Sequence, residues 1–161
     1  MPVEPDSSDP IDDAQSRMGG ALRWPFAGAT PIGSIAIAAE TADTITVVFS
    51  GDRRVHDHEK IEEQWEFWPA ATQRCRTLGI RRVLVLNELS GPLSSNYVRD
   101  FHSDLDRFGL DRAIRYAMVV RDPRSRSVLS LGIALAKEAG WDIEIFDERA
   151  SAEAWLARPL A

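Results

Sequence analysis

The amino-acid sequence predicts an α/β fold, in which an N-terminal β-hairpin is followed by βα units that form a mixed, mostly parallel sheet with packed helices. Two short β-branched runs, at residues 34–39 and 44–49, flank a turn segment and predict the hairpin. Further strand-like runs then alternate with segments of helical apolar spacing. Such alternation requires crossover connections, which leave neighbouring strands parallel.

The elements after the hairpin follow in a regular order. A helical spacing of apolar residues runs over residues 61–78 and ends at Gly79. Pro69 lies inside this pattern, so we expect a kink or a break there. The remaining strands and helices are expected, in alternation, at residues 82–86, 97–108, 115–120, 128–139, 142–146 and 151–160.

The composition is that of one globular domain. The chain has 161 residues, of which 44% are hydrophobic, and a net charge of −6. This charge argues against nucleic acid and an anionic membrane as partners, since both attract a basic surface. Cys75 is the only cysteine, so neither an intrachain disulfide nor a cysteine-rich zinc site can form.

The first 28 residues differ from the rest of the chain. Acids and prolines dominate there, so we expect a mobile acidic extension at residues 1–28 and the folded domain at residues 29–161. The start of the chain lacks the positive charge and apolar run of a secretory signal. No apolar stretch approaches the roughly 20 residues that span a bilayer. We therefore expect a cytoplasmic protein.

The loop at residues 87–96 is the first candidate site. It joins a predicted strand to the next helix and so lies at the C-terminal edge of the sheet, where open α/β sheets bind their ligands. Ser94, Ser95 or Asn96 could cap that helix, and capping is the favoured interpretation. A serine at the positive end of a helix could also carry a phosphate that acts as a switch.

A second candidate, residues 121–127, follows the next strand at the same edge. Arg121, Arg124 and Arg126 precede a predicted helix and could hold a phosphate or carboxylate through forked hydrogen bonds. Ser125 or Ser127 would cap that helix. The alternative is a solvated loop in which Arg121 pairs with Asp122. An anionic ligand or a phosphoserine partner becomes credible if both loops flank one pocket, which the spacing does not show.

Five short segments, taken together, resemble one known family. They are the hairpin end at 47–51, the strand at 81–86, the helix start at 93–95, the closing strand at 141–146 and the alanine-rich helix at 152–156. On these segments, residues 33–160 resemble a STAS-type domain, the fold of the bacterial sporulation anti-sigma-factor antagonists and their SpoIIAA-like relatives. The resemblance implies a regulatory domain without cofactor.

The resemblance also implies a role for one serine. In the antagonists, a serine at the start of the corresponding helix is phosphorylated by a partner kinase, which is also the anti-sigma factor. The matching position here is Ser95, with Ser94 beside it. The chain departs from the family's Asp-Ser-Ser-Gly pattern, because Leu93 replaces the aspartate and Asn96 the glycine. This departure weakens the phosphorylation hypothesis.

Catalytic and metal sites are not expected. His102 lies seven residues after Ser95 on the predicted helix. At a rise of about 1.5 Å per residue the two are about 10 Å apart, too far for direct proton transfer. One polar cluster resembles metal ligands in type, but helix capping and first-turn acids explain it better. Its members are Asp52, His56, Asp57, His58 and Glu59. Cys75 is expected to be buried and inert.

We therefore expect a non-enzymatic domain that binds a protein partner through the edge formed by residues 90–96 and 121–127. The family resemblance implies a partner of the anti-sigma kinase or sensor kind. No metal, nucleic acid or membrane is expected, and a homodimer stays open. The alternative is a small-molecule or lipid-binding domain of the same fold, in which the helix at 128–139 would line a cavity.

Overall fold

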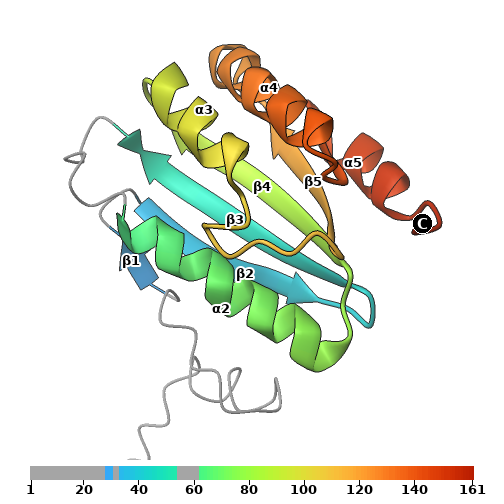
Figure 1. Ribbon diagram of the computed structural model, residues 1–161. Helices are drawn as coiled ribbons and strands as arrows, with labels where there is room; N and C mark the ends of the chain where they lie inside the picture. Colours follow the sequence, from blue (N-terminus) through green and yellow to red (C-terminus); the bar gives the residue numbers. More distant parts are fainter. Residues whose placement is uncertain (1–27, 31–32, 54–61) are drawn as a thin grey trace, which may run out of the picture.

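The computed structural model describes residues 28–30, 33–53 and 62–161, and this part of the chain forms a six-stranded sheet with packed helices (Figure 1). The strands lie side by side in chain order: β1 (Gly28–Thr30), β2 (Gly33–Glu40), β3 (Thr44–Asp52), β4 (Arg82–Ser90), β5 (Arg115–Val120) and β6 (Ile143–Phe146). The pairs from β1 to β3 are antiparallel and those from β3 to β6 are parallel. The predicted α/β class with a mixed, mostly parallel sheet is confirmed.

Helices cover both faces of this sheet. Those in the described part are α2 (Glu62–Leu78), α3 (Ser95–Ser103), α4 (Pro123–Glu138) and α5 (Arg149–Leu156). Successive side chains of a strand point to opposite faces. Val83 and Val85 of β4 accordingly belong to the larger core, together with Phe67 of α2. Residues of α4 are part of this core as well. Leu84, between them, packs with Leu156 of α5 on the opposite face.

The predicted hairpin is confirmed as β2 and β3, and its turn is closed by two threonines. The Thr44 N–H donates to Thr41 Oγ1 over 3.1 Å, and the Thr41 N–H donates to the Thr44 carbonyl over 2.9 Å. Hydroxyl side chains that bond nearby backbone groups favour turns over regular structure. The turn therefore fixes where β3 begins.

The helix α2 runs through Pro69 without interruption, so of the expected kink or break the break is wrong. Proline removes one backbone donor from a helix. Trp68 and Ala71 on either side are buried, at 7% and 3% exposure. Packing of an apolar face supplies most helical stability in proteins, and here it holds the helix together. The predicted end is confirmed: Gly79 follows the last turn with a φ of +68°.

Two helices end earlier than the sequence pattern predicts. α3 stops at Ser103 instead of residue 108, because Asp104 leaves the helical conformation with φ −147° and ψ 62°. Leu105 and Phe108 keep their helical spacing but are buried in the turn that follows. α5 ends at Leu156 instead of residue 160. Apolar spacing continued past the true helix ends because turn residues also face the core.

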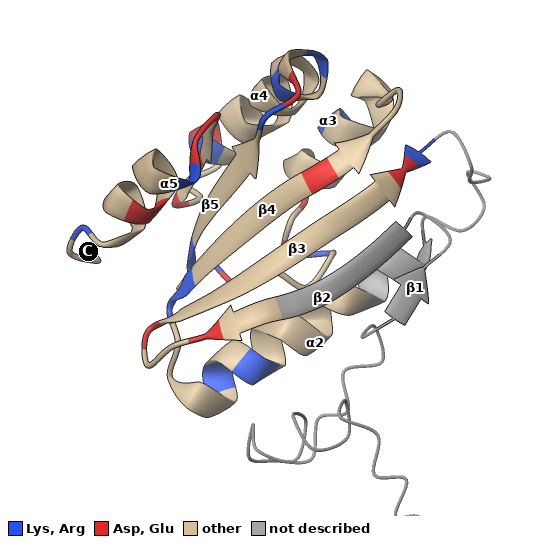
Figure 2. Cartoon of the chain, turned by 180° about the vertical axis from the view of Figure 1, so that it is seen from behind, with Lys and Arg blue, Asp and Glu red and all other residues tan. Residues whose placement is uncertain are grey.

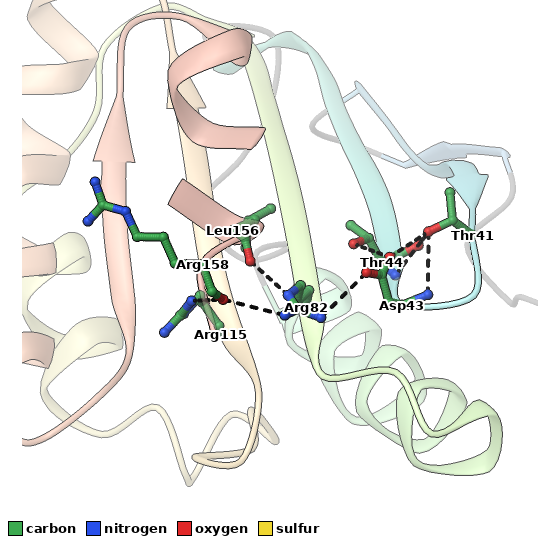
Figure 3. Close-up of polar contacts among 7 residues, drawn as sticks. All are labelled: Thr41, Asp43, Thr44, Arg82, Arg115, Leu156 and Arg158. Carbon is green, nitrogen blue, oxygen red and sulfur yellow. Dashed lines mark hydrogen bonds and ion pairs between the residues drawn. The ribbon is translucent and has the colours of Figure 1, made fainter. Parts of the chain in front are cut away.

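Two arginines hold the end of the chain at the amino edge of the parallel strands (Figure 3). Arg82, the first residue of β4, donates from Nε to the Leu156 carbonyl over 2.7 Å. Arg115, the first residue of β5, donates from Nη1 to the Arg158 carbonyl over 2.8 Å and from Nε to Asp142 over 2.7 Å. This edge is opposite to the one that carries the candidate loops.

Candidate functional site

The first candidate loop is shorter than predicted, because β4 continues to Ser90. The strand pairs with β3 in parallel register as far as Asp52↔Ser90, so the first four residues of the segment 87–96 are strand. Ser90 also donates from its hydroxyl to the Gly51 carbonyl over 3.1 Å. Only residues 91–94 connect β4 to α3.

Ser94 is the residue that caps α3. It has extended backbone angles, and its Oγ accepts a hydrogen bond from the Tyr97 N–H over 3.3 Å. An N-cap satisfies a backbone donor that the helix itself leaves unpaired. Ser95 is the first helical residue, and both Ser95 and Asn96 are exposed. Ser94 therefore caps the helix, and Ser95 does not.

The second candidate segment is largely helical, not a loop before a helix. α4 begins at Pro123 instead of residue 128, and Asp122 is its N-cap. The Asp122 carboxylate accepts from the Ser125 N–H over 2.9 Å, so the expected cap at Ser125 or Ser127 is wrong. Hydrogen bonds from the Ser125 hydroxyl and N–H lower the pKa of Asp122. Aspartate followed by proline is a strong helix-start signal that explains the difference.

The structure brings the two segments together around one open cleft of about 1050 Å³. Residues 86–93 form one wall, and the start of α4 forms the other. Of the predicted anion-binding residues, Arg121 and Arg124 line the cleft, whereas Arg126 does not. The Arg126 guanidinium instead donates from Nη1 to the Val120 carbonyl over 3.1 Å. Ser94, Ser95 and Asn96 lie just beyond Leu93, the last residue of their wall.

Arg53, directly after β3, connects the two walls. Its Nη1 donates to the Gly91 carbonyl over 3.1 Å and to the Ser125 hydroxyl over 3.2 Å. Gly91 belongs to the first wall and Ser125 to the second. Burial lowers the pKa of Arg53, opposed by attraction from Asp122. The side chain is therefore a partly buried brace that joins the two walls.

Both basic and acidic side chains line the cleft. Figure 2 shows that charged residues lie toward the ends of β3, β4 and β5 and are missing from the middle of these strands. Three arginines line the cleft, since Arg149 at the start of α5 joins Arg121 and Arg124. Glu88 and Asp122 contribute two carboxylates. The local balance is thus positive in a chain whose net charge is −6.

Arg53 and Arg149 were missed by the sequence analysis. Neither belongs to a motif. Arg149 lines the cleft from the start of α5, and Arg53, directly after β3, bonds to the lining residues Gly91 and Ser125. A basic residue directly after a strand at the C-terminal edge is the one signal that could have indicated Arg53.

His102 does not face the cleft. It is 3% exposed, and its Nδ1 lies 2.7 Å from the Val98 carbonyl. Since a carbonyl only accepts, Nδ1 carries the proton. His102 Nε2 is buried and finds no hydrogen-bond partner in the part of the chain that the structure describes. Burial lowers the pKa of His102, so the neutral ring is favoured.

The polar cluster considered for metal binding falls mostly outside the described residues, which include only Asp52 of its members. Across residues 28–30, 33–53 and 62–161, no group of three His, Cys, Asp or Glu side chains is arranged to hold a metal ion. The extension at residues 1–27 also lies outside the described part.

Comparison of the chain with protein-family models, curated proteins and solved structures finds no match. Within the described residues, no helix combines the length and apolar character required to cross a membrane.

Proposed function

We propose that this chain is a non-enzymatic regulatory domain of the STAS or SpoIIAA-like kind, which binds a protein partner at the C-terminal edge of its sheet. The observation that carries the proposal is one open cleft that both candidate segments line, the first with Leu93 and the second with Arg121. Open α/β sheets bind ligands at this edge. An open cleft with exposed basic side chains suits a segment of another protein.

Negative charge at Ser95 would regulate this interaction. The Ser95 side chain is exposed, and the α3 N-terminus is already capped by Ser94. A phosphate adds about −1.5 to −2 charges at pH 7, and a helix N-terminus tolerates them. The helix would therefore persist, while an anionic group appeared two residues from Leu93 in the cleft wall.

Photo-crosslinking in the native host tests the binding edge. A photoreactive residue replaces Pro92, which is exposed in the cleft wall, or Ala42, which is exposed in the hairpin turn at the opposite edge. We expect a discrete protein adduct from position 92 and none from position 42. Equal adducts from both positions, or none from position 92, would contradict the proposal.

A charge substitution tests the switch. Ser95→Asp should weaken the adduct formed from position 92, and mass spectrometry should find phosphate on Ser95 in host-derived protein. Ser103→Asp is the matched control, because Ser103 is an exposed serine at the other end of α3. Equal weakening by both variants, or an unphosphorylated Ser95 in every growth condition, would remove the switch from the proposal.

The small-molecule alternative is less well supported. Of the helix expected to line a cavity, Leu129, Ile133 and Ala136 are buried against the rest of the domain, and Val128 is its contribution to the cleft. Lipid that co-purifies with the chain, together with no protein adduct at position 92, would favour the alternative.

A further inference from the structure

We propose that the cleft binds a phosphate monoester carried by a segment of the partner protein, with Arg121 and Arg124 as the residues that hold the phosphate. This inference rests on the proposed function and adds the chemistry by which the partner is recognised. It concerns a phosphate on the partner, as distinct from one on Ser95.

Two guanidinium groups are available to a ligand. Arg121 follows β5, and Arg124 lies in the first turn of α4; both are exposed and both line the cleft. Within the described residues neither of them forms an ion pair, whereas Arg149 is bound to Glu153 over 2.7 Å. Guanidinium groups bind phosphate through paired, charge-assisted hydrogen bonds.

The backbone of α4 does not compete for this role. Its first-turn N–H groups already donate to the Asp122 carboxylate, including the bond of 2.9 Å from Ser125. Recognition of an anion therefore falls to the side chains. Glu88 and Asp122 line the same cleft and repel an anion. A dianion interacts with two guanidinium groups more strongly than a monoanion does, which favours phosphate over carboxylate.

The lining of the cleft includes apolar residues besides these cations: Leu86 of β4, Val119 of β5 and Val128 of α4. Leu86 and Val119 belong to the core that α5 covers, so packing holds them in place. A ligand with an apolar group beside its phosphate would bury that group here. A phosphorylated side chain with an apolar neighbour in sequence has this form.

Titration of the full, ¹⁵N-labelled chain with phenyl phosphate, followed by NMR, tests the chemistry. We expect shifts in the amides of residues 86–93 and 119–128. Affinity should rise from pH 5 to pH 7.5, because the second phosphate pKa is about 6. Benzoate and phenol should bind about tenfold more weakly, since they lack the dianion. Benzoate binding as tightly as phenyl phosphate would overturn the proposal.

Arginine variants locate the site. Arg121→Ala and Arg124→Ala should each raise the dissociation constant for phenyl phosphate about tenfold, because each variant loses a charge-assisted hydrogen bond to the phosphate. Arg99→Ala removes the same charge from an exposed position on α3 and should change this dissociation constant by less than about twofold. Equal effects of all three variants would overturn the assignment of the two arginines.

The crosslinking assay separates this inference from the function on which it rests. The adduct from position 92 should be lost when Arg121→Ala and Arg124→Ala are combined. It should also be lost when the crosslinking is repeated in a host extract that was treated with phosphatase before irradiation. An adduct that survives both treatments overturns the phosphate inference and leaves protein binding intact. Binding of phenyl phosphate without any adduct from position 92 overturns both, and identifies a site for a free phosphate ester.

Discussion

Arg53 and Ser125 are 72 residues apart in the sequence, yet the Arg53 guanidinium donates to the Ser125 hydroxyl over 3.2 Å. The same Nη1 donates to the Gly91 carbonyl over 3.1 Å. One side chain at the end of β3 therefore links the β4–α3 connection to the first turn of α4. This brace adds a polar link to the apolar packing between the two segments, in which Leu93 and Val128 belong to one cluster.

Replacing the brace should affect both stability and binding. Arg53→Met leaves the Gly91 carbonyl and the Ser125 hydroxyl without their donor, so we expect the free energy of unfolding to fall by about 1–2 kcal/mol. Binding of phenyl phosphate should weaken because the walls are no longer held together. Urea denaturation and NMR titration measure the two effects. Arg99→Met, at an exposed position, should change stability by less than about 0.5 kcal/mol. Equal stability of both variants would show that the brace is dispensable.

The contact between α3 and α4 requires glycine at position 132. A Cβ there would lie 2.5 Å from His102 Nδ1 and 2.6 Å from Val98 Cγ1. At an exposed position inside a helix, replacing glycine with alanine raises the free energy of unfolding by about 1 kcal/mol. Here we expect Gly132→Ala to lose about 1–3 kcal/mol through overpacking, measured by chemical denaturation. Leu131→Ala, at a residue that is 65% exposed, is the control and should be nearly neutral. A stabilised Gly132→Ala variant would contradict the close packing.

His102 should make stability depend on pH. Its pKa is lowered in the folded state by burial, from an ordinary value of 6.5. The unfolded chain therefore binds the proton more readily, and stability falls as pH decreases below 6.5 toward the folded pKa. The pKa values of Asp111 and Asp122 are lowered from 3.8, so their effects lie at lower pH.

The variant His102→Gln isolates this contribution. Unfolding free energies of both proteins, measured between pH 7.5 and pH 5, should show a smaller decline for the variant. Parallel curves would mean that His102 does not cause the decline.

Arg115 should stabilise the end of the chain. Its guanidinium donates to the Arg158 and Pro159 carbonyls and to Asp142, and it lies over the Trp155 ring at 5.0 Å. Arg115→Met should lower stability by about 1–3 kcal/mol and reduce amide protection in residues 152–158. Arg81→Met removes a more exposed bond, to the Ala113 carbonyl, and should have little effect. Unchanged hydrogen exchange in α5 of the Arg115 variant would contradict this role.

Cys75 should be unreactive in the folded protein. Cys75 is 1% exposed, and burial raises the pKa of its thiol to about 12. The thiolate is the reactive form, so iodoacetamide at pH 8 should label Cys75 only after unfolding. Mass spectrometry before and after denaturation measures this. Rapid labelling of the native protein would indicate that the thiol becomes accessible through local opening.

Element type was more predictable than element boundaries. The strand at residues 115–120 was predicted with the bounds that β5 has, because a short, mostly apolar run between turn residues is a local signal. The start of α4 was predicted five residues late, although Asp122 and Pro123 form a helix-start signal. The end of α3 was placed too late, since Leu105 and Phe108 contact the core from a turn.

The sequence by itself determined the order of strands and helices and the sheet edge at which both candidate segments lie. Periodicity, glycine and turn residues act over a few neighbours, so they can be read locally. Only the tertiary structure decided which side chains form the cleft. It brought Arg149 to the cleft, bonded Arg53 to the lining residue Ser125 and turned Arg126 toward the Val120 carbonyl. Such choices depend on packing between elements that are distant in the chain, and no local pattern encodes them.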